Sequence, residues 1–202
     1  MGDLIELRCG GRIRIRPLDA DDRNALAEGF ERLGPESRYR RFFAPVARLT
    51  DAQLEYLTDV DHHDHEALVA VDEDTRDGVG VARFVRLAEG VAEPAVAVAD
   101  DWQRRGVGTH LLDALADRAR EEGIGVFVAP VLADNAAALG LLEGLGEVEL
   151  ERRGEEVEVR IALRDARGAG SPLQRLLRHA AAEAVRSPAS FWQRVTDRRT
   201  TR

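Results

Sequence analysis

The sequence predicts a mixed α/β fold, in which helices flank one sheet of mostly antiparallel strands. Two pairs of neighbouring strand-like runs, 67–71 with 79–87 and 148–150 with 157–161, predict hairpins. Between these hairpins the chain alternates strand, helix, strand and helix, which is typical of a sheet that also contains parallel strands. Together with a first run at 12–16, these segments predict a single mixed sheet.

The first helices follow the first strand. Residues 12–16 alternate arginine and isoleucine, the period of a half-buried strand, and Pro17 ends the run. A helix is predicted over 19–33, because aspartates occupy its first turn, where the helix dipole favours negative charge. Gly34-Pro35 ends this helix, and residues 36–43 predict a short helix or an ordered loop.

The middle of the chain predicts a capped helix and a hairpin. Thr50 or Asp51 caps a short helix, since both side chains can accept a hydrogen bond from the first turn. The continuous apolar run 67–71 predicts a strand that is buried on both faces. A turn at Asp77-Gly78 then returns the chain as its partner strand, 79–87.

Two further strands and a long helix follow. A strand at 93–99 leads toward a helix at 107–122, whose leucines and alanines recur at helical spacing until Gly123. The next strand is predicted at 124–128, and Pro130 is expected to end it because proline cannot donate to a sheet.

The last elements complete one domain. A helix is predicted over 135–145 with Gly146 at its end, and the final hairpin turns at Arg153-Gly154. A linker rich in glycine and other small residues then divides the chain. We therefore expect a domain of residues 1–164 and a basic helical appendage, 165–202.

Charge is unevenly distributed along the 202 residues. All 29 cationic side chains are arginine, and 37 acidic residues bring the net charge to −8. Residues 166–202 hold eight arginines against Glu183 and Asp197, a net of +6, which leaves −14 for residues 1–165. An acidic body attracts cationic partners and repels phosphates, which argues against nucleic acid as the main partner.

Composition also bounds the location of the protein. No apolar run approaches the roughly 20 residues needed to cross a bilayer, and the N-terminus has no secretory pattern. Cys9 is the only cysteine, which excludes an intrachain disulfide and a cysteine-based zinc site. These features predict a cytoplasmic protein and leave its oligomeric state undetermined.

Residues 103–109, Gln-Arg-Arg-Gly-Val-Gly-Thr, connect the strand 93–99 with the helix that follows. Glycines let backbone N–H groups approach an anion, and the helix start adds unsatisfied amides and a positive dipole end. Arg104 and Arg105 add charge that can pair with a diphosphate. The spacing fits neither a dinucleotide-binding Gly-x-Gly-x-x-Gly nor an NTPase phosphate loop, so the loop predicts another kind of pyrophosphate site.

The loop resembles the pyrophosphate motif of the GNAT superfamily of acetyl-CoA-dependent N-acetyltransferases. That motif, Gln/Arg-x-x-Gly-x-Gly/Ala, is matched by Gln103, Gly106 and Gly108, and the resemblance extends over residues 11–163 and the order of strands. It implies a GNAT-type fold with a splayed parallel strand pair, acetyl-CoA as co-substrate and no metal. The cofactor-binding residues it implies are Val96, Val98, Gln103, Arg104, Arg105, Gly106, Val107, Gly108, Thr109 and Asn135.

Two segments are similar to the bacterial protein lysine acetyltransferase branch of this superfamily: Pro35-Glu-Ser-Arg-Tyr-Arg-Arg-Phe-Phe43 and Thr58-Asp-Val-Asp61. The similarity implies a protein lysine as acceptor and, at this length, a stand-alone catalytic domain. Enzymes of the branch carry a glutamate ten positions before the motif glutamine, which implies Glu93 as the general base. Many GNAT enzymes use a tyrosine as general acid, but the matching position here is Leu142.

A polar cluster, Asp61-His-His-Asp-His65-Glu66, lies just before the strand 67–71. Its imidazoles and carboxylates are chemically suited to a metal. Alternate residues approaching a strand point apart, however, so His63 and His65 can share a face that His62 does not join easily. We therefore predict no metal and place Asp61, His62 and His63 near the substrate entrance, where a histidine contact responds to pH.

The sequence thus predicts an N-acetyltransferase that transfers an acetyl group from acetyl-CoA directly to a primary amine, in particular a protein lysine. Two alternatives stay open. The acceptor can be a small-molecule amine, since an acidic entrance suits either cation. The chain can also be a non-catalytic acyl-CoA sensor that recruits a partner through its arginine-rich tail.

Overall fold

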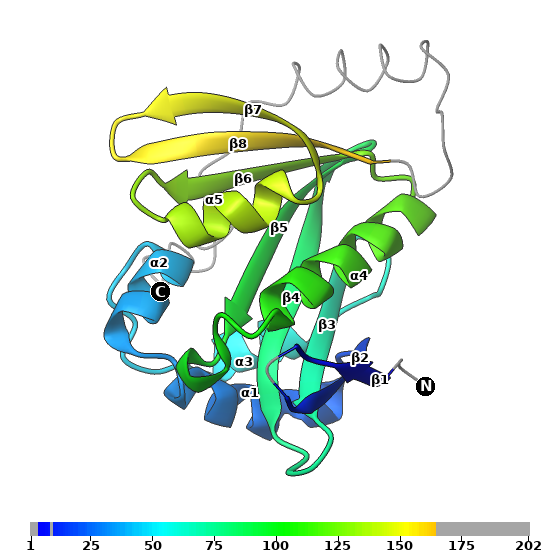
Figure 1. Ribbon diagram of the computed structural model, residues 1–202, viewed down its shortest axis with the longest axis vertical. Helices are drawn as coiled ribbons and strands as arrows, with labels where there is room; N and C mark the ends of the chain where they lie inside the picture. Colours follow the sequence, from blue (N-terminus) through cyan, green and yellow to red (C-terminus); the bar gives the residue numbers. More distant parts are fainter. Residues whose placement is uncertain (1–3, 9, 165–202) are drawn as a thin grey trace. The chain divides into compact units, whose positions relative to one another are not determined.

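The computed structural model describes residues 4–8 and 10–164 (Figure 1). The strands are β1 (Leu4–Glu6), β2 (Arg12–Pro17), β3 (His65–Asp72), β4 (Gly78–Ala88), β5 (Val91–Val98), β6 (Val126–Leu132), β7 (Gly146–Arg153) and β8 (Glu156–Leu163). The helices are α1 (Arg23–Glu31), α2 (Pro35–Phe42), α3 (Asp51–Thr58), α4 (Val107–Glu121) and α5 (Ala136–Glu143), with 3-10 turns η1 (Ala20–Asp22) and η2 (Asp100–Trp102). Within this described part of the chain, no helix is both long and apolar enough to cross a membrane. The predicted appendage, 165–202, lies outside it.

The strands form one mixed sheet in the order β1-β2-β3-β4-β5-β6-β8-β7. The β5–β6 pair is parallel, whereas β1–β2, β2–β3, β3–β4, β6–β8 and β7–β8 are antiparallel. The predicted fold class, a largely antiparallel sheet with one parallel pair and flanking helices, is confirmed.

Contacts divide the chain into two compact units. The first comprises Met1–Val85 and Ala95–Arg118, and the second comprises Arg86–Pro94 and the residues from Ala119 onward. The division passes through β4, β5 and α4, so each of these elements belongs to both units.

Two helix starts have reciprocal capping boxes, of which the sequence predicted the one at Thr50 or Asp51 and gave the aspartates after residue 18 only a dipole role. Thr50 accepts a hydrogen bond from the Gln53 backbone N–H, and the Gln53 side chain accepts one in return from the Thr50 N–H. Asp19 and Asp22 form the same reciprocal box at η1. Each box satisfies backbone donors that have no partner inside a helix, which fixes where the chain turns from coil to helix.

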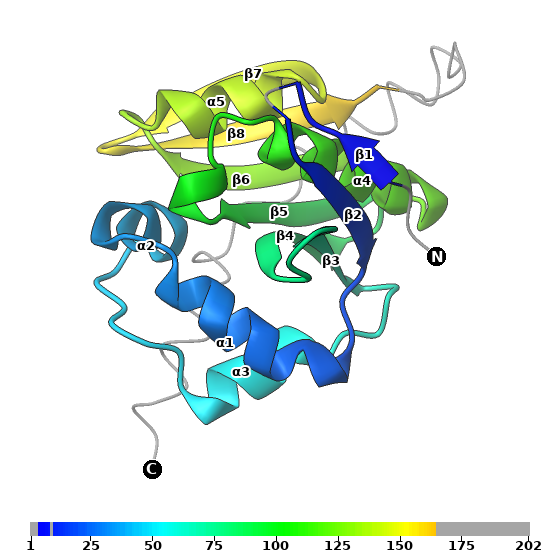
Figure 2. The same cartoon turned by 60° about the horizontal axis from the view of Figure 1, so that its bottom comes forward.

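The core of the first unit lies beneath two neighbouring helices. The α1 and α3 helices lie side by side in both views (Figures 1 and 2). Leu18, Ala67 and Val69 are buried and pack with the partly buried Leu26 and Val60. The predicted apolar run of β3 therefore supplies this core.

A glycine sets the distance between α4 and β4 in the first unit. A Cβ at Gly80 would lie 2.9 Å from Leu111 and 3.3 Å from Val107. Leu111, Leu112 and Leu115 form the predicted apolar stripe of α4, and each is at most 1% exposed. Glycine at position 80 thus allows the first turns of α4 to pack directly on the strand.

In the second unit, β8 lies between β6 and β7, and α5 packs on β7 and β8. The sequence assigned Gly146 to the end of the last helix. The structure instead ends α5 with Gly144 as C-cap and begins β7 at Gly146, which pairs with Leu163. A Cβ at Gly146 would collide with the carbonyl oxygen of Ala162, so close strand pairing explains this glycine.

The end of β6 and the presence of β1 differ from the prediction. β6 continues through Pro130, which was expected to end it, and Pro130 pairs with Glu158 of β8. Among the described residues, β5 pairs with β6 only at Val126 and Phe127, so Pro130 lies where β6 has one partner strand and a missing N–H is tolerated. β1 was not predicted, because three residues are too few to show a period.

We predict that Gly146→Ala lowers the free energy of unfolding by about 2 kcal/mol, since overpacking against backbone forces the hairpin apart. Gly140→Ala, in α5, is the matched control, because a Cβ there has no atom within 4 Å. It is expected to leave stability unchanged or to raise it by up to about 1 kcal/mol. Urea unfolding of the full chain measures both, and equal effects would contradict the packing argument.

Candidate functional site

The connection from β5 to α4 contains two left-handed backbone positions. The φ angle is +59° at Arg104 and +93° at Gly106, and Arg105 between them is not left-handed. Alternation of this kind turns successive N–H groups to one side and forms a concave anion site. Glycine adopts the conformation freely, whereas an L-residue such as Arg104 does so at a cost of about 1–2 kcal/mol.

Helix α4 begins directly after this turn. Its first hydrogen bond runs from the His110 N–H to the Gly106 carbonyl oxygen at 3.1 Å. The N–H groups of Val107, Gly108 and Thr109 precede that bond, so none of them has an acceptor within the helix. With the positive end of the helix dipole, they supply the donors that an anion site of the predicted kind would need.

Arginine and tryptophan support the same loop. Trp102 is 9% exposed, and the Arg105 guanidinium lies 5.0 Å from the centre of its ring. Such a contact orients a cation without neutralising it. Arg104 and Arg105 are both exposed, so their charge is available to an anionic ligand.

The side chain of Gln103 contacts the protein itself. Its Nε2 donates toward the Val98 carbonyl oxygen at 3.1 Å, Asp100 Oδ1 at 2.9 Å and Ser37 Oγ at 3.1 Å. The sequence predicted a cofactor contact for Gln103 but no role for Asp100 or Ser37. Ser37 comes from α2, far away in the sequence, and no local pattern could have identified it.

The parallel pairing of β5 with β6 ends just before Glu93, the predicted general base. β5 begins at Val91 rather than at Glu93, and its parallel pairs with β6 are Val91–Val126 and Ala92–Phe127. Glu93 and Pro94 follow these pairs, and proline has no N–H to continue them. Glu93 is 7% exposed, so the predicted base is a buried carboxyl inside β5. Val96 and Val98 lie further along the same strand.

The start of α5 is as predicted. Asn135 is its N-cap, and its Oδ1 accepts a hydrogen bond from the Ala138 N–H at 3.2 Å. Leu142, at the position where related enzymes often have a tyrosine, is buried in the same helix at 6% exposure. The role of Asn135 toward a cofactor stays a prediction.

Asp61 organises the loop before β3. Its Oδ1 accepts backbone N–H bonds from His63, Asp64 and His65 at 2.8–2.9 Å. Partial burial opposes ionisation, but these donors together hold the pKa of Asp61 below its usual value. The carboxylate therefore holds the backbone of this loop in place. Its contact with the substrate stays a prediction.

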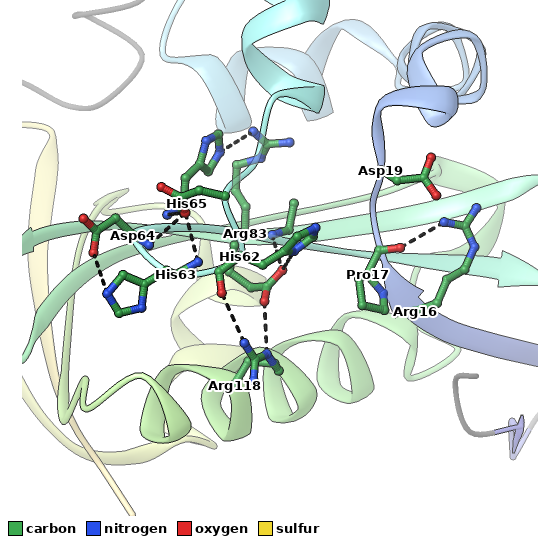
Figure 3. Close-up of polar contacts among 12 residues, drawn as sticks. Arg16, Pro17, Asp19, His62, His63, Asp64, His65, Arg83 and Arg118 are labelled. Carbon is green, nitrogen blue, oxygen red and sulfur yellow. Dashed lines mark hydrogen bonds and ion pairs between the residues drawn. The ribbon is translucent and has the colours of Figure 1, made fainter.

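His62 is partly exposed and contacts the buried carboxylate of Glu66 (Figure 3). Its Nδ1 lies 2.7 Å from Glu66 Oε1, and Arg118 donates to Glu66 Oε2 at 3.0 Å. Glu66 is 1% exposed, so the arginine compensates a carboxylate that water cannot reach. Arg118 lies eleven residues along α4 from Val107, about 16 Å at 1.5 Å per residue, so His62 lies far from the anion loop.

His65 points into a second polar cluster (Figure 3). It belongs to β3, which starts two residues earlier than predicted, and it stacks on Tyr56 with ring centres 5.3 Å apart. Its Nε2 lies 3.1 Å from Arg83 Nη1, and Arg83 also donates to the Leu57 carbonyl oxygen at 2.9 Å. Burial, then the Arg83 charge, lowers the pKa of His65 to about 4, and burial lowers the pKa of Arg83 to about 10.

The histidine cluster is thus divided between structural contacts. His62 pairs with Glu66 on one side of β3, and His65 pairs with Arg83. Among residues 4–8 and 10–164, no three His, Cys, Asp or Glu side chains converge as metal ligands.

Comparisons with known proteins find a matching family, similar sequences and similar structures. Residues 28–146 match the Acetyltransferase (GNAT) family. Acetyltransferase Pat of Mycolicibacterium smegmatis is 36% identical over 146 residues, which cover 71% of this chain and 44% of the relative. Acetyltransferase PA5475 of Pseudomonas aeruginosa is 35% identical over 114 residues, which cover 54% of this chain and 61% of the relative. The crystal structure of the GNAT domain of S. lividans PAT aligns with a TM-score of 0.73 at 31% identity, covering 80% of this chain and 97% of that domain.

The chain therefore belongs to the GNAT acetyltransferase family. It spans about half the length of the curated relatives it matches, 44% of one and 61% of the other. The predicted superfamily is confirmed.

We predict that stability falls as the pH falls from about 6.5 to about 4, in part because of His65. The pKa is lower in the folded state, about 4 against an ordinary 6.5, so the unfolded chain binds the proton more tightly. The corresponding loss is at most about 3 kcal/mol, at about 1.4 kcal/mol per factor of ten in proton affinity.

His65→Gln should flatten this part of the pH profile, whereas His63→Gln, at an exposed position, should leave it unchanged. Urea unfolding at a series of pH values measures the difference from the wild type. Identical profiles for the wild type and His65→Gln would show that this imidazole is not responsible.

Proposed function

We propose that this protein transfers an acetyl group from acetyl-CoA to a primary amine, with a protein lysine as the acceptor. The observation that carries the proposal is the loop at 103–109, whose left-handed turn and free helix amides fit a pyrophosphate. Family membership supports it, because the relatives are named acetyltransferases.

The loop would bind the diphosphate of the co-substrate. The N–H groups around Gly106 and at the start of α4 would donate to its oxygens, with charge supplied by Arg104 and Arg105. The pantetheine arm would pair with the backbone of Val96 and Val98, and Asn135 would help to hold it. These roles rest on the resemblance to the family and on the position of each residue in the fold.

Glu93 would act as general base. A lysine amine is mostly protonated near neutral pH and must lose a proton before it attacks the thioester carbonyl carbon. Glu93 would accept that proton, directly or through a water, while the carbon–sulfur bond breaks and CoA leaves as a thiolate. Its burial and its position where the β5–β6 pairing ends support this role. A thiolate is a fair leaving group, so Leu142 in place of a tyrosine is compatible with turnover.

The net charge of −14 over residues 1–165 supports a cationic acceptor. A protein lysine is favoured by the segments similar to the protein acetyltransferase branch, and a small-molecule amine is the competing outcome. Incubation of the full chain with acetyl-CoA and a panel of lysine-bearing proteins, followed by mass spectrometry, tests the choice. Thiol release without protein acetylation, but with small amines, would favour the second acceptor.

We expect Gly108→Val to weaken acetyl-CoA binding at least ten-fold, because glycine lets a diphosphate approach the first α4 amides more closely than a branched residue does. Gly140→Val is the control, since its Cβ has no neighbour within 4 Å. Isothermal titration of the folded variants with acetyl-CoA measures the effect. A folded Gly108→Val protein with wild-type affinity would remove the main argument for this site.

Glu93→Gln should keep acetyl-CoA affinity within about three-fold and lower kcat at least 100-fold, as expected for loss of a general base. Glu89→Gln is the control, because Glu89 is exposed at the β4–β5 turn and should have no effect. Thiol release with an accepted substrate measures both. Unchanged turnover in Glu93→Gln would exclude this carboxyl as the base.

A further inference from the structure

Two carboxylates precede the anion loop, Asp100 and Asp101. Negative charge so close to a bound diphosphate weakens binding by repulsion. Asp101 is neutralised by an ion pair, in which its Oδ2 lies 2.7 Å from Arg32 Nη2. Asp100 instead accepts hydrogen bonds from uncharged donors.

The Asp100 carboxylate collects three donors from two segments. Its Oδ2 accepts from the Gly34 N–H at 3.0 Å. Its Oδ1 accepts from Ser37 Oγ at 2.7 Å and from Gln103 Nε2 at 2.9 Å. A Cβ at Gly34 would lie 2.6 Å from Oδ2, so any other residue there would displace the carboxylate.

Gln103 closes the arrangement. Its Nε2 also reaches the Val98 carbonyl oxygen and Ser37 Oγ, both at 3.1 Å. The end of β5, η2 and the first residue of the loop are therefore joined in a ring of hydrogen bonds. Ser37 lies in the first turn of α2, so the same ring attaches that helix to the loop.

We propose that Asp100 is a positioning residue for the co-substrate. It acts through Gln103: by holding that side chain against Val98 and Ser37, it fixes the backbone at which the left-handed turn of Arg104 and Gly106 starts. The inference rests on the proposed binding of acetyl-CoA at this loop. It adds that hydrogen bonds connect α2 to the loop before the co-substrate binds.

Charge and position predict opposite effects, which makes the inference testable. If Asp100 matters only through its charge, replacing it should tighten the binding of an anion. If it positions the loop, Asp100→Ala should weaken binding, because Gln103 loses its acceptor and the loop amides lose their alignment. Asp100→Asn discriminates further, since its amide oxygen keeps the acceptor for Ser37 and Gln103 without the charge, while its NH2 group leaves the Gly34 N–H without an acceptor.

The experiment is isothermal titration of the full chain with acetyl-CoA, together with KM and kcat for thiol release. We expect Asp100→Ala to raise Kd and the KM for acetyl-CoA about ten-fold with kcat within three-fold. Asp100→Asn should lose less affinity than Asp100→Ala, because it keeps two of the three hydrogen bonds. Asp101→Ala, which removes the same charge one residue away, should bind as tightly as the wild type or more tightly. Ser37→Ala should weaken binding by less than Asp100→Ala.

Each outcome bears on a separate claim. Equal or tighter binding by Asp100→Ala would overturn the positioning role while leaving the proposed function intact. Tighter binding by Asp100→Asn than by the wild type would also overturn it, because the charge would then outweigh the contacts of the side chain. Absence of acetyl-CoA binding by the wild type would instead refute the proposed function itself.

Discussion

The change of backbone handedness at Arg104 and Gly106 is the constraint on which the rest of the candidate site depends. It directs N–H groups to one side, and it ends where α4 begins, so the free amides of the helix continue the same surface. A turn of this kind has little stability of its own. Around it, Arg105 contacts the Trp102 ring, the Gln103 side chain donates to the Val98 carbonyl oxygen, and α4 packs closely on Gly80.

Charge in the first unit serves mainly structure. Glu66 and Arg83 are almost fully buried, and each is compensated by contacts from another element: Arg118 of α4 in one case, His65 of β3 and the end of α3 in the other. Burying a charge without such partners costs several kcal/mol. The cluster at 61–66 is chemically suited to a metal in isolation. In the structure, its Glu66 and His65 connect β3 to α4 and to β4.

The proposed chemistry follows from the order of the elements along one path of the chain. β5 carries Glu93 where its pairing with β6 ends, continues through Val96 and Val98, and enters the loop that suits a diphosphate. Family membership and the geometry of the loop support the same co-substrate, and the acidic charge of the domain fits a cationic acceptor.

The sequence by itself determined the features that depend on local chemistry. Period and turn residues predicted the mixed sheet, Thr50 and Asn135 predicted helix starts, and Gly106 predicted the turn before α4. Tertiary structure decided what depends on distant partners. Only the tertiary structure shows that β6 continues through Pro130, because a proline is tolerated only where one edge of the strand is unpaired. It also joined Ser37 to Asp100 and His65 to Arg83, because hydrogen bonds between residues far apart in the chain leave no period or spacing in the sequence.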